Sequence, residues 1–106
     1  MKILFDQGVP VPLRRHLHPN SVDTASELGW SLLTNGDLIS RAEKQGYNLL
    51  VTTDQNLRYQ QNLSHRTINI AVLMTTSWPR IKDAVSQVQK SITSLTKPGQ
   101  YIEIDI

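Results

Sequence analysis

Short apolar runs alternate with segments of helical spacing along this chain, and that alternation constrains the fold more than any other feature. Leu49-Leu50-Val51 is a continuous apolar run, which is typical of a strand buried on both faces of a parallel sheet. Two further runs, at 2–5 and 68–73, are separated from it by segments of helical spacing. Strands that alternate with helices predict an α/β fold, here a three-layer α/β/α sandwich with a mainly parallel central sheet of four or five strands.

Residues that typically begin or end helices define the remaining elements. Pro10 opens the first expected helix, Gly46 closes the second, and Lys97-Pro98-Gly99 closes the last. Residues 101–106 alternate strictly between apolar and polar side chains, which predicts an edge strand exposed on one face. The expected helices lie at 10–17, 34–45, 55–63 and 78–97, and the expected strands at 2–5, 21–25, 49–51, 68–73 and 101–106.

The size and composition of the chain limit its class. With 106 residues, 39% of them apolar, it has room for one core, so we expect residues 1–106 to form a single domain. It has no cysteine, which excludes disulfide scaffolds and favours the reducing cytoplasm. Its apolar runs are too short for a membrane helix, so we expect a soluble cytoplasmic protein without membrane contact. A formal charge of +2 permits contact with a phosphate backbone without demanding it.

Three aspartates stand at the ends of these expected elements. Asp6 follows the first strand, Asp54 follows the strand at 49–51, and Asp37 lies at the start of the helix between them. Because the carboxyl ends of parallel strands border one crevice, the three carboxylates can converge there. Such carboxylates repel one another unless a divalent cation neutralises them, and Mg²⁺ or Mn²⁺ prefers oxygen ligands of this kind. A metal at this point can activate water for phosphodiester cleavage.

Each aspartate also has a purely structural interpretation. Asp37 can form a capping box with Thr34 and benefit from the helix dipole. Asp54 can cap the helix that follows it, and Asp6 can shape a turn before Gly8. Both interpretations of the three acids stay open at this point.

Five short motifs together carry a resemblance to a known family. They are Ile3-Leu4-Phe5-Asp6, Pro10 with Leu13 and Leu17, Ala25 to Trp30, Asp37-Leu38-Ile39 with Ala42 and Gly46, and Leu50 to Asp54. In this order and spacing they resemble the small PIN-like domains related to VapC toxins. The resemblance implies a PIN-like, Rossmannoid sheet and a metal-dependent ribonuclease that is the toxin component of a toxin–antitoxin pair. It assigns the metal-binding positions to Asp6, Asp37 and Asp54.

The chain departs from the family pattern at two places. Gln7-Gly8 stands where the family commonly has an acidic or amide pair, and Asn56 stands where it commonly repeats an aspartate. Asparagine offers a carbonyl oxygen but no charge, so Asn56 is expected to assist the three aspartates in catalysis while weakening Mg²⁺ or Mn²⁺ binding. The alternative function is therefore a catalytically degenerate PIN-like module that binds RNA or a protein partner.

Basic and aromatic side chains are candidates for binding single-stranded or structured RNA. Arg58 and Tyr59 follow Asp54 on the next expected helix, and Arg14 lies on the first helix. Each can contact a phosphate or stack on a base if it faces the crevice. A solvated helix surface is an equally reasonable interpretation of these residues.

Two other site types fit the sequence poorly. His16 and His18 lie two residues apart, which on a helix points them in different directions, and this argues against a zinc site with His65. A phosphoacceptor receiver domain needs its Lys-Pro pair after a strand, whereas Lys97-Pro98 follows a helix here.

The last expected helix has a wide apolar face, and an exposed strand follows it. This apolar surface predicts a homodimer or a complex with a cognate antitoxin. An antitoxin would lay a segment across the acidic crevice, where a basic side chain can replace the charge of the metal. The alternative is that the apolar face simply packs on the sheet.

Overall fold

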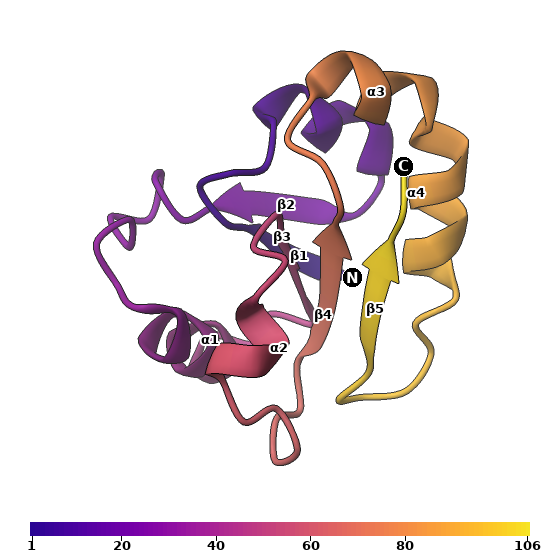
Figure 1. The fold of residues 1–106 in the computed structure, drawn as a ribbon. Helices are drawn as coiled ribbons and strands as arrows, with labels where there is room; N and C mark the ends of the chain where they lie inside the picture. The colour runs from indigo at the N-terminus through magenta and orange to yellow at the C-terminus, as the bar shows by residue number, and fades with distance from the viewer.

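The fold is built on a five-stranded sheet in the order β2-β1-β3-β4-β5, as the computed structural model of residues 1–106 shows (Figure 1). Every neighbouring pair of strands is parallel. β1 and β3 are neighbours, with Ile3 opposite Leu49, so the predicted parallel sheet of four or five strands is confirmed. The strands are β1 (Lys2–Phe5), β2 (Ser21–Thr24), β3 (Leu49–Thr52), β4 (Asn69–Leu73) and β5 (Tyr101–Ile104).

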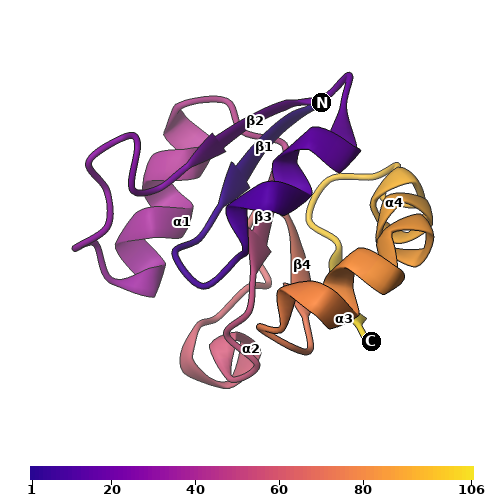
Figure 2. The same ribbon diagram turned by 90° about the horizontal axis from the view of Figure 1, so that it is seen from above.

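Helices cover both faces of this sheet (Figure 2). The 3₁₀ helix η1 (Val11–Leu17) lies on one face with α3 (Trp78–Asp83) and α4 (Val85–Thr93), where a cluster of 15 buried residues forms. On the opposite face, α1 (Asn35–Lys44) and α2 (Leu57–Gln60) pack over a second cluster of 11 buried residues. The α/β class predicted from the alternation of elements is thereby confirmed.

The pleat of the strands explains why the central runs are apolar throughout. Ile3 and Phe5 of β1 belong to one buried cluster, while Leu4 between them belongs to the other. All residues of β3 and β4 are buried, because successive side chains point to opposite faces and both faces are covered. β5 is less buried and lies at the edge of the sheet, as predicted.

Three expected helices differ from the sequence prediction. The first is a 3₁₀ helix, because Pro10 and Pro12 remove two amide donors at its start. The helix expected at 55–63 ends at Gln60, and the Asn62 side chain then accepts bonds from Ser64 at 3.1 and 2.6 Å, forming a turn. The long last helix is broken into α3 and α4 at Ala84, whose φ of −108° is not helical, and no glycine or proline marks this break in the sequence.

The apolar face of the last helices is not available to a partner. Ile81 of α3 and Val88 and Ile92 of α4 are buried in the core, so this face packs on the sheet. The exposed apolar surface from which we predicted a homodimer is therefore absent at this place. None of the helices is both long and apolar enough to cross a membrane.

Candidate functional site

Asp6 and Asp54 lie together at the carboxyl edge of the two central strands. Asp6 directly follows β1, and its amide donates to the Val51 carbonyl of β3 at 2.9 Å. The hydroxyl of Thr52, a residue only 1% exposed, donates to Asp6 Oδ2 at 3.0 Å and accepts from the Asp54 amide at 3.1 Å. One buried hydroxyl therefore fixes both acids relative to each other.

The other carboxylate oxygens accept bonds from neutral groups. Asp6 Oδ1 accepts from the Gln7 amide at 2.8 Å, and Asp54 Oδ1 accepts from the Asn56 amide at 3.0 Å. Asp54 Oδ2 accepts from Asn35 Nδ2, at the start of α1, at 2.9 Å. The three ion pairs of the structure lie elsewhere, so both half-buried acids lack a cationic side-chain partner. This arrangement leaves negative charge at the edge of the sheet.

The loop after β1 is packed tightly against the loop after β3. Gly8 lies so close to Thr53 that a Cβ added at Gly8 would collide with the Thr53 hydroxyl. The Asp6 carbonyl also accepts from the Val9 amide at 3.1 Å, which closes a turn here. The turn predicted after Asp6 is confirmed, and a glycine at position 8 lets the two acid-bearing loops approach each other.

Asp37 is not part of the hydrogen-bonded pair. It is exposed in the first turn of α1, and its amide donates to the side chain of the N-cap residue Thr34 at 3.4 Å. The Thr34 hydroxyl therefore caps the start of α1, while the Asp37 carboxylate accepts no amide hydrogen bond and the expected capping box is incomplete. Asn35, two residues earlier, bonds Asp54 instead, because residues at i and i+2 of a helix do not face the same way.

Asn35 is not among the residues predicted for the site, although it lies at the same helix start as Asp37. The available signal was its position as the first helical residue next to the expected crevice. No group of three or more His, Cys, Asp or Glu side chains is arranged to hold a metal ion. Hydrogen bonds join Asp6 to Asp54 through Thr52 and join Asp54 to the neutral Asn35, and the Asp37 carboxylate takes no part in them.

Asn56 and the following helix α2 border this site. Asn56 is exposed, and its side chain makes no capping hydrogen bond, so its amide is free for other contacts. Arg58 lies 4.8 Å from the ring centroid of Tyr59, a residue 72% exposed. The Nε of the same guanidinium lies 3.7 Å from the Glu103 carboxylate, so the Arg58 side chain points towards β5, the outer strand of the sheet.

Tyr101 of β5 completes this cluster. The pKa of Tyr101 is raised to about 12, first by burial and then by its hydrogen bond to the Glu103 carboxylate.

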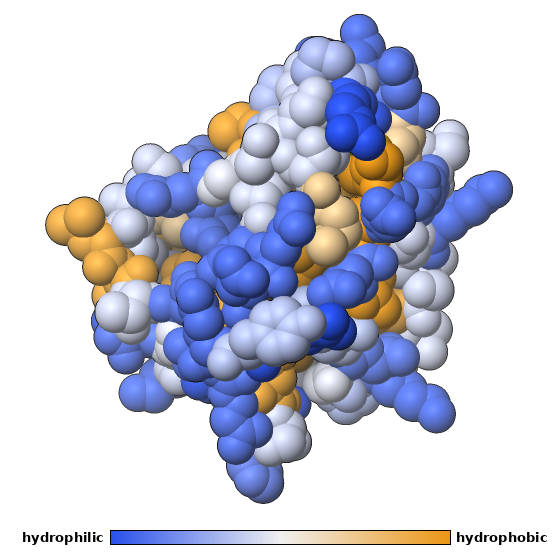
Figure 3. Space-filling model, viewed as in Figure 1, coloured by the Kyte–Doolittle hydropathy of each residue, from blue (hydrophilic) through white to orange (hydrophobic).

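Hydrophilic side chains dominate the face of the molecule that Figure 3 shows. One apolar group protrudes at the left of the same view, over the loop between β2 and α1, where Leu32 is 97% exposed.

Arg14, the third residue predicted to bind RNA, lies on η1 near the opposite face of the sheet. Its guanidinium pairs with Glu27, with Nη2 to Oε1 at 2.7 Å and Nη1 to Oε2 at 3.2 Å. These bonds direct the Arg14 side chain to the β2 edge, where it lines a pocket separate from the contacts of Asp6 and Asp54.

Comparisons of this chain with protein-family models, with curated proteins and with solved structures give no match.

Proposed function

We propose that the protein is a Mg²⁺- or Mn²⁺-dependent ribonuclease of the PIN-like, VapC-related toxin type, with Asp6 and Asp54 as its metal-binding carboxylates. The observation that carries this proposal is the pair of acids joined through the Thr52 hydroxyl at the edge of β1 and β3. The all-parallel sheet with helices on both faces agrees with a three-layer PIN-like sandwich. Ligands of such sheets bind at the carboxyl ends of the strands.

Two carboxylates suffice for a magnesium site of the kind that nucleases use. Mg²⁺ is commonly held by one or two carboxylates, with water and substrate phosphate completing its shell. Each oxygen of Asp6 and Asp54 accepts a single hydrogen bond from the protein, and a carboxylate oxygen has two lone-pair sites. Both acids therefore keep acceptor capacity, and the donor set fits a hard cation.

The residues around the pair have separate roles in this proposal. A bound metal lowers the pKa of a water ligand and balances charge on the phosphate. Thr52 and Asn35 orient the two carboxylates, and the free amide of Asn56 contacts the substrate or a water at the rim. Asp37, which lies in the same helix start, adds negative charge without a direct bond to the pair.

Arg58 and Tyr59 are the side chains that we propose for RNA contact. Tyr59 presents an exposed ring on α2, directly after the site, and a base can stack on such a surface. Arg58 is held beside that ring by a 2.6 Å hydrogen bond to the Tyr59 hydroxyl. A cognate antitoxin that inserts a basic side chain between Asp6 and Asp54 would block the site at the carboxyl ends of β1 and β3.

A degenerate binding module is the second candidate, and one observation favours it. Asn35 donates to Asp54 Oδ2, so a neutral amide takes the place next to Asp54 that a third acid was expected to take. A site with fewer charges binds divalent cations more weakly. In this case the protein would bind RNA through α2 without cleaving it.

Cleavage of a single-stranded RNA in Mn²⁺ and in chelator tests the proposal. We expect cleavage only with metal, and a loss of about 100-fold or more in Asp6→Asn and in Asp54→Asn, because the metal contributes several kcal/mol to the barrier. Asp83→Asn, at the exposed end of α3, is the control with the same change of charge and should retain activity.

Two other outcomes separate the candidates. Equal cleavage in chelator and Mn²⁺ would contradict the metal-dependent mechanism. Binding of RNA without any cleavage, lost in Tyr59→Leu and kept in Asp54→Asn, would favour the binding module.

A further inference from the structure

Arg58 connects the short helix α2 to the edge strand β5, and its contacts differ in strength. Its Nη2 donates to the hydroxyl of the neighbouring Tyr59 at 2.6 Å. Its Nε lies 3.7 Å from Glu103 Oε2, which is too long for a hydrogen bond, so this ion pair acts through charge alone. The Tyr101 ring centroid lies 6.0 Å from the Arg58 Cζ. The arginine that we propose for RNA contact is therefore already paired with an acid of the protein.

The Glu103 carboxylate is held in this place by its own strand. Its Oε2 accepts from the Tyr101 hydroxyl, two residues earlier on β5, at 3.0 Å. Residues at i and i+2 of a strand point to the same face, which brings this ring and this carboxylate side by side. The Glu103 side chain is 30% exposed and the Arg58 side chain 45% exposed. Solvent and dissolved anions therefore reach both partners of the ion pair.

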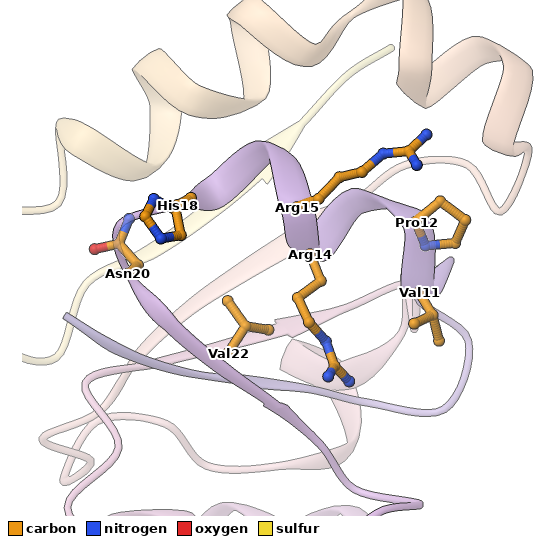
Figure 4. Close-up of a pocket in the computed structure, with 7 residues that line it drawn as sticks. All are labelled: Val11, Pro12, Arg14, Arg15, His18, Asn20 and Val22. Carbon is orange, nitrogen blue, oxygen red and sulfur yellow. The ribbon is translucent and has the colours of Figure 1, made fainter.

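Arg14 shows how a permanent ion pair is built in the same protein. Its guanidinium donates to the two carboxylate oxygens of Glu27 at 2.7 and 3.2 Å, and the Thr24 amide donates to the same carboxylate at 2.9 Å. Figure 4 shows the Arg14 side chain extending from η1 to the strand β2, within a pocket of about 380 Å³. The contact of Arg58 with Glu103 has no hydrogen bond and no main-chain donor, so an external anion can displace it.

A phosphate group of RNA is a stronger partner for Arg58 than Glu103 is at this distance. Arginine makes charge-assisted hydrogen bonds to a phosphate, and these are often bidentate. An ion pair between exposed side chains contributes little, equivalent to at most about fivefold in an equilibrium constant. The need to release Arg58 from Glu103 therefore lowers the affinity for RNA by a small factor without preventing binding.

We propose that Glu103 is an internal competitor for the RNA phosphate that Arg58 binds, and that it thereby sets the affinity of α2 for RNA. This inference rests on the proposed function, in which Arg58 and Tyr59 contact RNA. In the free protein, the Glu103 carboxylate stands in for the phosphate, and the pair is electrically neutral. When RNA binds, the guanidinium turns to the phosphate, and the Tyr101 hydroxyl keeps its hydrogen bond to the released carboxylate.

Fluorescence anisotropy with a labelled oligouridylate in chelator tests this proposal without metal or cleavage. We expect Glu103→Gln to bind the RNA about threefold more tightly than the wild type, within the range of an exposed ion pair. Glutamine keeps an acceptor for the Tyr101 hydroxyl, so β5 should be unchanged. Asp105→Asn, the same change of charge at an exposed position two residues further on, should bind as the wild type does. Unfolding curves verify that all variants are folded.

The Arg58→Gln background separates competition from simple repulsion. There, Glu103→Gln should have no further effect, because no guanidinium remains to be released. A threefold gain that persists without Arg58 would assign the effect to repulsion between Glu103 and the RNA and would overturn the proposal. Weaker binding of Glu103→Gln in the presence of Arg58 would also overturn it, because Glu103 would then be a support that positions Arg58.

Metal-dependent cleavage distinguishes a failure of this proposal from a failure of the proposed function. If the wild type cleaves RNA in Mn²⁺ while Glu103→Gln binds it with unchanged affinity, only the competition by Glu103 is refuted. If neither the wild type nor Glu103→Gln binds RNA, both the competition and the ribonuclease function are refuted.

Discussion

Two carboxylate networks stand at opposite ends of the sheet, and they use their acids differently. Glu43 of α1 clamps the segment that leads into β4, where its Oε2 accepts from the Thr67 amide at 2.7 Å, the Thr67 hydroxyl at 3.1 Å and the Ile68 amide at 3.3 Å. Its Oε1 accepts from Arg66 Nη1 at 2.9 Å. At the carboxyl end, Asp6 and Asp54 accept only from neutral donors.

The difference lies in the charge that each network leaves uncompensated. Burial opposes ionisation of Glu43, but its bonds from Thr67, Arg66 and Ile68 outweigh this and hold the pKa of Glu43 below its usual range. Arg66 neutralises the Glu43 carboxylate, so this ion pair serves the stability of the fold. The pair of aspartates has no such cation, so it retains attraction for one from solution. An acid is a better functional candidate when its neighbours orient it without neutralising it.

The largest expected change in stability comes from removing the Glu43 clamp. In Glu43→Ala, the half-buried Arg66 and the Thr67 and Ile68 amides lose their acceptor, so the free energy of unfolding should fall by about 3 kcal/mol. Denaturant unfolding measures this change. Lys44→Ala, the exposed neighbour on α1, should change stability little, and an equal effect of the two substitutions would contradict the role of Glu43.

Thr52→Val removes the hydroxyl that joins the two aspartates while keeping the shape of the buried side chain. It leaves Asp6 Oδ2 and the Asp54 amide without partners, so we expect a loss of about 2 kcal/mol in unfolding free energy and a clear loss of metal affinity. Titration calorimetry with Mn²⁺ follows the second effect. Thr76→Val, at an exposed position, is the control. Unchanged metal affinity in Thr52→Val would mean that the acids need no common support.

Measuring the free energy of unfolding at several pH values isolates the contribution of the Glu43 network. Since the pKa of Glu43 is lowered on folding from its ordinary value of 4.5, its contribution to stability is complete above that pH and is lost as the pH falls through the folded value. The difference in unfolding free energy between the wild type and Glu43→Gln should therefore shrink below pH 4.5. A difference that stays constant down to pH 3 would contradict this linkage.

The smallest effect is expected at Asp37, the predicted metal-binding acid that lies outside both networks. Asp37→Asn should lower stability by about 0.5 kcal/mol through the helix dipole of α1 and should leave Mn²⁺ affinity close to that of the wild type. Asn35→Leu, two residues earlier, should alter Mn²⁺ affinity because it frees Asp54 Oδ2. The opposite ranking in titration calorimetry would return Asp37 to the metal site.

Particular elements show how far the sequence predicts this molecule. The apolar run at Leu49–Val51 correctly predicted a central strand, and its position fixed Asp54 at the edge of the sheet beside Asp6. The break at Ala84 had no local signal that distinguishes it from a continuous helix. The contact of Asn35 with Asp54 had only one local signal, the position of Asn35 at the start of the helix. Both depend on residues distant in the chain.

The sequence by itself determined the strands, their parallel direction, which follows from the alternating helices, and the placement of Asp6 and Asp54 at strand ends. These features follow from local periodicity, which each segment carries without reference to the others. The tertiary structure alone decided that Thr52 joins the two acids, that Asn35 instead of Asp37 contacts Asp54, and that Arg14 turns to Glu27. Such contacts depend on the direction of each side chain and on how the loops pack. A shift of one residue in the register of a strand turns its side chains to the other face and removes these contacts.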